Sequence, residues 1–180
     1  ALATALFHGA IRTAHAVRAI DAVDTPPRRG ELARALGYWA ARYRDGQTAS
    51  PLPPAGDLRM AVVEAAADGA RRYLARPGIV HLHGVTGAMA VEILAARIPA
   101  ADGAAALAQV LAEHAALYAA TEPVTQPHPA SRPGSELTVA AVRSLDPHQV
   151  KLVEACRRGH AATGDPAFAA AAETVTGLYA

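Results

Sequence analysis

The sequence predicts an all-α protein, a compact alanine-rich bundle of about seven to eight helices in which residues 1–180 form one helical domain. Alanine, the strongest helix former, supplies 47 of the 180 residues, whereas only 8 residues are aromatic. Alternating β-branched residues, which favour strands, are almost missing. Proline and glycine divide the chain into segments of helical length. These observations argue against a β-sandwich or a β-barrel.

The first two predicted helices are separated by the sequence Thr25-Pro26-Pro27. The first covers residues 4–20, where apolar side chains recur at roughly helical spacing until the break. The second follows the prolines and runs to about residue 45. Its expected core stripe has helical spacing and consists of Leu32, Leu36, Trp39 and Tyr43.

Two helices are predicted in the middle of the chain. A proline-stiffened loop at residues 50–56 precedes Asp57, which is typical of an N-cap and predicts a helix over 57–75. The next helix is expected over 79–97. Two glycines, Gly84 and Gly87, are expected to loosen its first turns.

The last third of the chain is predicted to contain four helices and one long loop. A helix over 102–120 is followed by the loop at 122–134, which contains four prolines and is the best internal boundary. A short helix over 135–143 comes next. Asp146 and Pro147 then predict the N-cap and first position of a further helix, and the final helix covers 167–179.

Charge and cysteine content exclude several classes of protein. The net charge of +1 offers no basic surface for nucleic acid and no polybasic membrane anchor. No apolar run is long enough for a transmembrane helix. The single cysteine, Cys156, cannot form an internal disulfide, so a reducing compartment, the cytoplasm, is expected. The oligomeric state stays open.

Histidine is as frequent as all aromatic residues together, and eight are present. His8 and His15 lie two helical turns apart and therefore share a helix face. His83 is favoured over His81 as a functional residue because glycines follow it and permit close approach of a ligand. Each of these residues could equally be a hydrogen-bonded structural histidine. His114 and His160 are expected at exposed positions or next to site residues. His128, between two prolines, is expected in a loop.

Lys151 is the only lysine among seventeen basic residues, and it follows His148 by three positions. Both residues fall in the first turns of a predicted helix, where the helix dipole lowers the pKa of a basic group. A chain that uses arginine for general positive charge is expected to retain a lysine for its amine. Such an amine can act as a base, form a Schiff base or, after reaction with carbon dioxide, ligate a metal as a carbamate. The alternative is an ordinary surface cation.

Several familiar catalytic motifs are missing from the sequence. It contains no Glu-x-x-His, no His-Glu-x-x-His and no adjacent His-Asp pair, which argues against a ferritin-like di-iron site and common hydrolytic metal sites. Gly84-Val-Thr-Gly87 lacks the other parts of a dinucleotide fingerprint, and no nucleophile elbow is present. A single cysteine excludes a zinc–cysteine cluster.

Three segments together resemble the questin oxidase-like family. They are FHGAIRTAHAVRAIDAVDTPPRRGELARALGYWAARY, HLHGVTG and SLDPHQVKLVEAC, in the family's order and over almost the whole chain. The resemblance implies an oxygenase that cleaves aromatic, anthraquinone-like polyketides in a Baeyer–Villiger-like reaction. It also implies that this chain is the C-terminal part of a longer protein whose N-terminal segment carries a further histidine. Fungal members have a second histidine where this chain has Arg12, and His15 follows one turn later.

The family resemblance leads to a hypothesis for the site. His8, His83 and His148 would ligate one non-haem Fe(II), and Lys151, for example as a carbamate, would supply an anionic ligand. Lys151, His15 and Arg12 are the expected catalytic residues. Dioxygen would be the co-substrate, NADPH is optional because no motif for it occurs, and the partner would be a small aromatic molecule. The aromatic side chains Phe7, Tyr38, Trp39 and Tyr43 could stack on it or belong to the core.

Two other functions fit the same residues. A metal-dependent hydrolase could use the same histidines and Lys151, since carbamylated lysines also serve hydrolytic centres. A catalytically inactive helical module would use the histidines only as core residues. Convergence of the imidazoles of His8, His83 and His148 with the Lys151 amine is the geometric requirement for a site.

Overall fold

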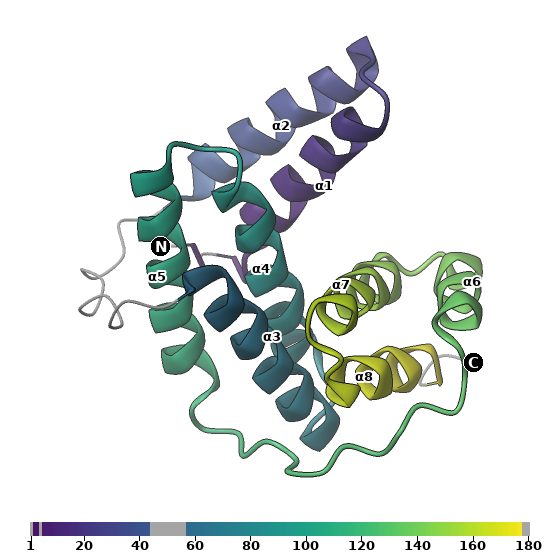
Figure 1. Ribbon diagram of the computed structural model, residues 1–180. Coiled ribbons are helices and arrows are strands. Elements are labelled where there is room, and N and C mark those ends of the chain that lie inside the picture. Colours follow the sequence, from purple (N-terminus) through teal and green to yellow (C-terminus); the bar gives the residue numbers. More distant parts are fainter. Residues whose placement is uncertain (1, 4, 44–56, 178–180) are drawn as a thin grey trace.

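The computed structural model describes residues 2–3, 5–43 and 57–177, and within these ranges it consists of eight α-helices without a strand (Figure 1). The helices are α1 (His8–Ala22), α2 (Pro26–Arg42), α3 (Leu58–Ala75), α4 (Ile79–Ala95), α5 (Ala100–Tyr118), α6 (Gly134–Ser144), α7 (Pro147–Thr163) and α8 (Pro166–Gly177). The predicted all-α bundle is therefore confirmed. None of these helices is long and apolar enough to cross a membrane. The proline loop expected at 50–56 lies outside the described residues.

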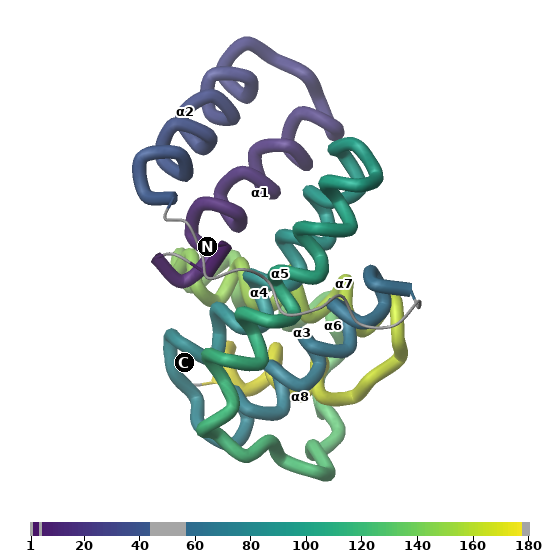
Figure 2. Tube along the Cα trace, turned by 90° about the vertical axis from the view of Figure 1, so that its left-hand side faces the viewer, coloured from purple at the N-terminus to yellow at the C-terminus, as the bar shows by residue number. Residues whose placement is uncertain are grey.

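Helix α4 lies at the centre of the bundle, where it packs against α1, α3, α5 and α7. Twelve of its seventeen residues are buried, which explains why its sequence is apolar on every side. Helices α6, α7 and α8 form a second group that joins the rest mainly through α7 and α8. Helix α2 lies on the outer side of α1, away from the other described helices (Figure 2).

Gly84 and Gly87 do not loosen α4, which is a continuous helix through both positions. They instead remove side chains where other elements approach its backbone. A Cβ at Gly84 would lie 3.1 Å from the ring of Tyr118, and one at Gly87 would overlap the ring of Phe7. The helix keeps its hydrogen bonds while α1 and α5 come close to it.

The first helix begins at His8, later than the sequence predicts. Ala5, Leu6 and Phe7 have positive φ angles of 52°, 53° and 61°, so this segment makes a left-handed turn. The turn buries Phe7 completely against α4. Burial of a large aromatic side chain stabilises this turn enough to override the local helix propensity.

The expected core stripe of α2 is wrong in two of its four positions. Leu36 is 49% exposed and Tyr43 is 43% exposed, whereas the fully buried residue of this helix is Ala35. Among the described elements α2 packs only against α1, so it buries one narrow face. Trp39 lies on that face and covers Gly9.

The predicted helix boundaries after residue 56 are largely confirmed. Asp57 and Asp146 both cap helices through their side chains, and Pro147 is the first residue of α7. The proline-rich segment runs without helix up to Pro133. Its end is attached to α8, because Ser131 donates two hydrogen bonds to the carboxylate of Glu173.

His114 is only 4% exposed, so of its two expected positions, at the surface or next to a site residue, the first is wrong. It projects from α5 toward Gly69 and Gly84, where missing side chains leave room for its ring. Within the described ranges its Nε2 has no hydrogen-bond partner, and burial lowers the pKa of the ring to about 4. The ring is therefore neutral in the folded protein at pH 7.

Glycine at position 159 is predicted to be required for packing of α7 against α8. A Cβ there would overlap the buried ring of Phe168, so Gly159→Ala should lower the free energy of unfolding by about 1–3 kcal/mol. Gly37→Ala is the matched control, because nothing lies within 4 Å of its Cβ position and helix propensity should raise stability by about 0.5–1 kcal/mol. Urea denaturation measures both. Equal effects of the two substitutions would contradict this packing.

The buried His114 is predicted to make the protein less stable in mild acid. In the unfolded chain the ring gains a proton below its ordinary pKa of about 6.5, while the folded state resists protonation until about pH 4. His114 should thus contribute nothing to the pH dependence of stability above this range and about 2 kcal/mol to its loss between pH 7 and pH 4.5. His114→Gln should remove that part of the pH dependence. Parallel stability-against-pH curves for the two proteins would refute the assignment.

Candidate metal centre

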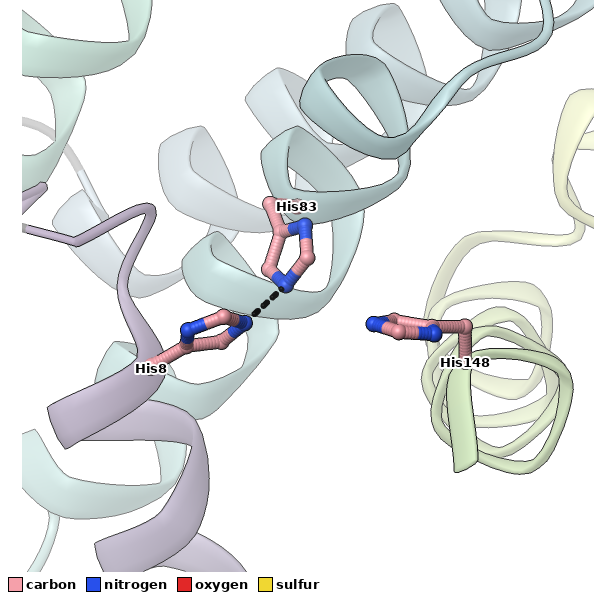
Figure 3. Close-up of side chains that lie close together, drawn as sticks. All are labelled: His8, His83 and His148. Atoms are coloured by element: carbon pink, nitrogen blue, oxygen red, sulfur yellow. Dashed lines mark hydrogen bonds between the residues drawn. The ribbon is translucent and has the colours of Figure 1, made fainter. Parts of the chain in front are cut away.

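Three histidines from distant parts of the chain converge at one point (Figure 3). His8 is the first residue of α1, His83 lies in the second turn of α4, and His148 is in the first turn of α7. Each offers one ring nitrogen, and these nitrogens all lie within 4.8 Å of one another. The expected convergence of the three imidazoles is thereby met.

Packing around α4 brings two of the three histidines together. Gly87 lies one turn after His83 on the same face of α4, and this is where the Phe7 ring fits. Because His8 directly follows Phe7, docking of that ring sets His8 beside His83. The N-terminus is held further by Glu113 of α5, which accepts hydrogen bonds from the backbone N–H groups of Leu2 and Ala3.

His83 is fully buried, and both of its ring nitrogens have partners. Nδ1 lies 2.6 Å from the backbone oxygen of Ile79, which can only accept, so Nδ1 carries the proton and donates it. Nε2 therefore presents a lone pair, and Nε2 of His8 lies 2.8 Å away and donates to it. Burial lowers the pKa of His83 to about 4.

This arrangement fits a divalent metal ion. Two imidazole nitrogens bound to the same ion lie about 3.0–3.4 Å apart, so small ring movements would replace the His8–His83 hydrogen bond by two metal bonds. Burial, with the nearby Lys151 and His148, lowers the pKa of His8 as well. Neutral imidazoles are the form that binds metals, and Fe, Zn, Cu and Ni all accept them.

A cavity of about 650 Å³ opens beside the three histidines, between the α1–α2 pair and the start of α7. His8 and His148 line it, while His83 lies behind them. The three expected catalytic residues also line it: Arg12, His15 and Lys151. The structure thus brings every predicted site residue to the cavity or to the histidine cluster.

Lys151 is half-buried in the cavity wall, one turn after His148. Burial lowers the pKa of its amine, and the opposing attraction of Asp146 is the smaller effect. Among the described residues no hydrogen bond or ion pair holds this amine. Within the described part of the chain it makes no hydrogen bond to the three imidazoles, so the structure brings Lys151 to their cavity without bonding it to them.

Two residues of α2 complete the cavity. Glu31 pairs with Arg12 at 2.7 Å, and Tyr38 lies with its ring centroid 5.7 Å from the Arg12 guanidinium carbon. Glu31 was not expected at the site, since it belongs to no motif and lies nineteen positions from Arg12. Pairing of α2 with α1 brings the two together. His15 is two turns beyond His8, and burial lowers its pKa.

The other histidines lie outside the cluster. His81 points away from it, and its Nε2 lies 2.9 Å from the hydroxyl of Thr121. His128 and His160 are exposed, in agreement with the sequence-based expectation. The choice of His83 over His81 as the residue near a site is consistent with this geometry.

Comparison of the chain with protein-family models, with curated proteins and with solved structures finds no match in any of the three. The resemblance to the questin oxidase-like family therefore stays a prediction. The candidate centre is defined by the geometry of its own residues.

The three-histidine cluster is predicted to bind one divalent ion per chain. Replacing His83 by Gln removes the best-oriented nitrogen, so the affinity for Fe(II) under anaerobic conditions should fall by about 100-fold or more. His160→Gln is the matched control because His160 is exposed and outside the cluster. Equilibrium dialysis with metal analysis measures both variants. Unchanged binding in His83→Gln would show that the ion binds elsewhere.

Proposed function

We propose that this chain carries the metal centre of an oxygenase that resembles the questin oxidase-like family and cleaves aromatic, anthraquinone-like substrates. The observation that carries the proposal is the convergence of His8, His83 and His148 beside a cavity lined by Lys151. These four residues come from the three sequence segments on which the resemblance rests. His8, His83 and His148 are separated by more than sixty positions from one to the next, so nothing local places them together.

The metal would be held by the three imidazoles. When bound, Fe(II) would supply a site at which dioxygen is activated. His83 is oriented by the backbone of its own helix. His8 and His148 border the cavity, so the side of the ion that faces the cavity would be accessible to substrate. The absence of a carboxylate among the three ligands means that a negative ligand must come from another group.

Lys151 is our candidate for that ligand, as a carbamate. Its amine is half-buried, and the lowered pKa increases the fraction of neutral amine. The neutral amine adds to carbon dioxide and releases one proton, which converts the side chain into an anionic oxygen donor. The free volume of the cavity beside Lys151 accommodates the added group.

The remaining cavity residues suit an aromatic ketone or phenol. Tyr38, with Ala16, Ala19, Pro147 and Val150, offers apolar surface for a flat ring system. His15 is kept neutral by burial and can accept a phenolic proton. Arg12, held in place by Glu31, can orient a carbonyl oxygen.

The electron balance distinguishes two forms of the reaction. If both atoms of dioxygen enter the cleaved product, substrate plus O2 gives the product with no other reductant. If one atom is inserted next to the carbonyl carbon and the other leaves as water, two further electrons and two protons are needed, and NADPH would supply the electrons. NADPH dependence of turnover therefore identifies the form.

A metal-dependent hydrolase is the second candidate function. Three imidazoles with an open position are also a ligand set of catalytic zinc, which activates water instead of dioxygen. The same cavity residues would then surround a hydrolysable substrate. Anaerobic turnover separates the two, because an oxygenase stops without dioxygen.

The proposal is tested by oxygen uptake with a hydroxylated anthraquinone and Fe(II). We expect uptake that stops under anaerobic conditions and falls by about 100-fold or more in Lys151→Ala. Arg143→Ala serves as the control, because this arginine lies on α6 and does not line the cavity. A carbamate would give a 13C NMR signal from labelled bicarbonate that Lys151→Ala lacks. Lack of bound iron, together with full activity of Lys151→Ala, would overturn the proposal.

A further inference from the structure

We propose that Asp146 is a positioning residue for the metal centre, which orients the imidazole of His148 and determines its tautomer. This inference rests on the proposed metal site and adds to it a residue that contacts no ion. Asp146 has another visible function as the N-cap of α7, so its role at the centre must be argued separately from capping.

One oxygen of Asp146 contacts His148 at two places. Oδ1 accepts a hydrogen bond of 2.8 Å from the backbone N–H of His148 and also lies 3.3 Å from ring atom Nδ1. The carboxylate is thus held by the helix backbone, and it lies at ion-pair distance from the ring. Its side chain is only 28% exposed, which limits competition from water.

A carboxylate beside Nδ1 favours the tautomer with the proton on that nitrogen. The lone pair then resides on the other ring nitrogen, Nε2. Figure 3 shows that the ring nitrogen farther from α7 points toward His8 and His83. Asp146 therefore directs the metal-binding lone pair of His148 into the cluster.

At His83 the group beside Nδ1 is a backbone oxygen, and there the contact is a hydrogen bond of 2.6 Å. The backbone oxygen of Ile79 accepts this bond from Nδ1–H, and Nε2 faces the cluster. Metal-ligating histidines generally donate their second ring N–H to such a carboxylate or carbonyl. Two of the three ligands are thus oriented from within their own helix. Among the described residues, no hydrogen-bond acceptor contacts Nδ1 of His8, so His8 is left to adjust when a metal enters.

Capping alone does not explain this geometry. Asp57 caps α3 in the same way, with Oδ1 accepting from the backbone N–H groups of Arg59 and Met60. No imidazole lies at that cap. At α7 the capping oxygen of Asp146 accepts from the backbone of His148, and His148 is one of the three histidines that converge.

Substitutions that preserve the cap can separate the two roles of Asp146. Ser and Asn cap helices about as well as Asp, so Asp146→Ser and Asp146→Asn should fold normally. Serine at position 146 is too short to reach the ring of His148 and has no charge. Asparagine keeps an uncharged oxygen that can accept from Nδ1–H of His148. Asp57→Ser is the matched control for exchanging a capping aspartate. Thermal unfolding verifies that all variants are folded.

The experiment combines titration with Co(II), followed by its visible absorption, and 15N NMR of the histidine tautomers without metal. We expect Asp146→Ser to bind Co(II) about 10–100-fold more weakly than the unmodified protein, Asp146→Asn to be intermediate, and Asp57→Ser to be unchanged. The His148 resonance, assigned with His148→Gln, should change from the Nδ1–H tautomer toward the Nε2–H tautomer in Asp146→Ser.

The outcomes distinguish a failure of this inference about Asp146 from a failure of the proposed metal site. Equal Co(II) affinity in Asp146→Ser and the unmodified protein would overturn it, and so would weaker binding without a change of tautomer, since Asp146 would then act only through its charge. If the unmodified protein binds no Co(II), the proposed metal site fails. The NMR comparison would still decide whether Asp146 orients His148, because it needs no metal.

Discussion

His83 carries two polar ring nitrogens into the most buried helix of the bundle, and each must find a partner there because an unsatisfied polar group in the interior is costly. One nitrogen uses the backbone of its own helix, and the other uses His8. The second contact requires α1 to approach α4 closely. Gly87 permits that approach, and the buried Phe7 ring stabilises it.

The chemistry of the site depends on this burial. Desolvation favours uncharged bases, so His83 is neutral and the pKa values of His8, His15 and Lys151 are lowered. Neutral imidazoles and a neutral amine are the forms that bind metals or react with carbon dioxide. The same cavity is also lined by the ion pair of Arg12 with Glu31, whose charges cancel.

Errors in the sequence-based predictions share a cause. The start of α1 and the stripe of α2 were inferred from local periodicity, but a tertiary contact decides each of them. Docking of Phe7 against α4 imposes a left-handed turn before His8, and contact with α1 alone leaves Leu36 exposed. His114 is polar enough to suggest the surface, yet glycines on two neighbouring helices make room for it inside. Glu31 carries no local signal, since its role comes from pairing with Arg12 across a hairpin.

The sequence by itself determined the all-α class, most helix boundaries and the capping of α3 and α7, because propensity, proline placement and side-chain caps act between neighbouring residues. It also singled out His8, His83, His148 and Lys151 as residues to consider. Only the tertiary structure decided that the three imidazoles meet, that Lys151 lines their cavity, and that Nε2 of His83 faces His8. These properties depend on distances between residues more than sixty positions apart, which helix packing around α4 sets and local sequence does not encode.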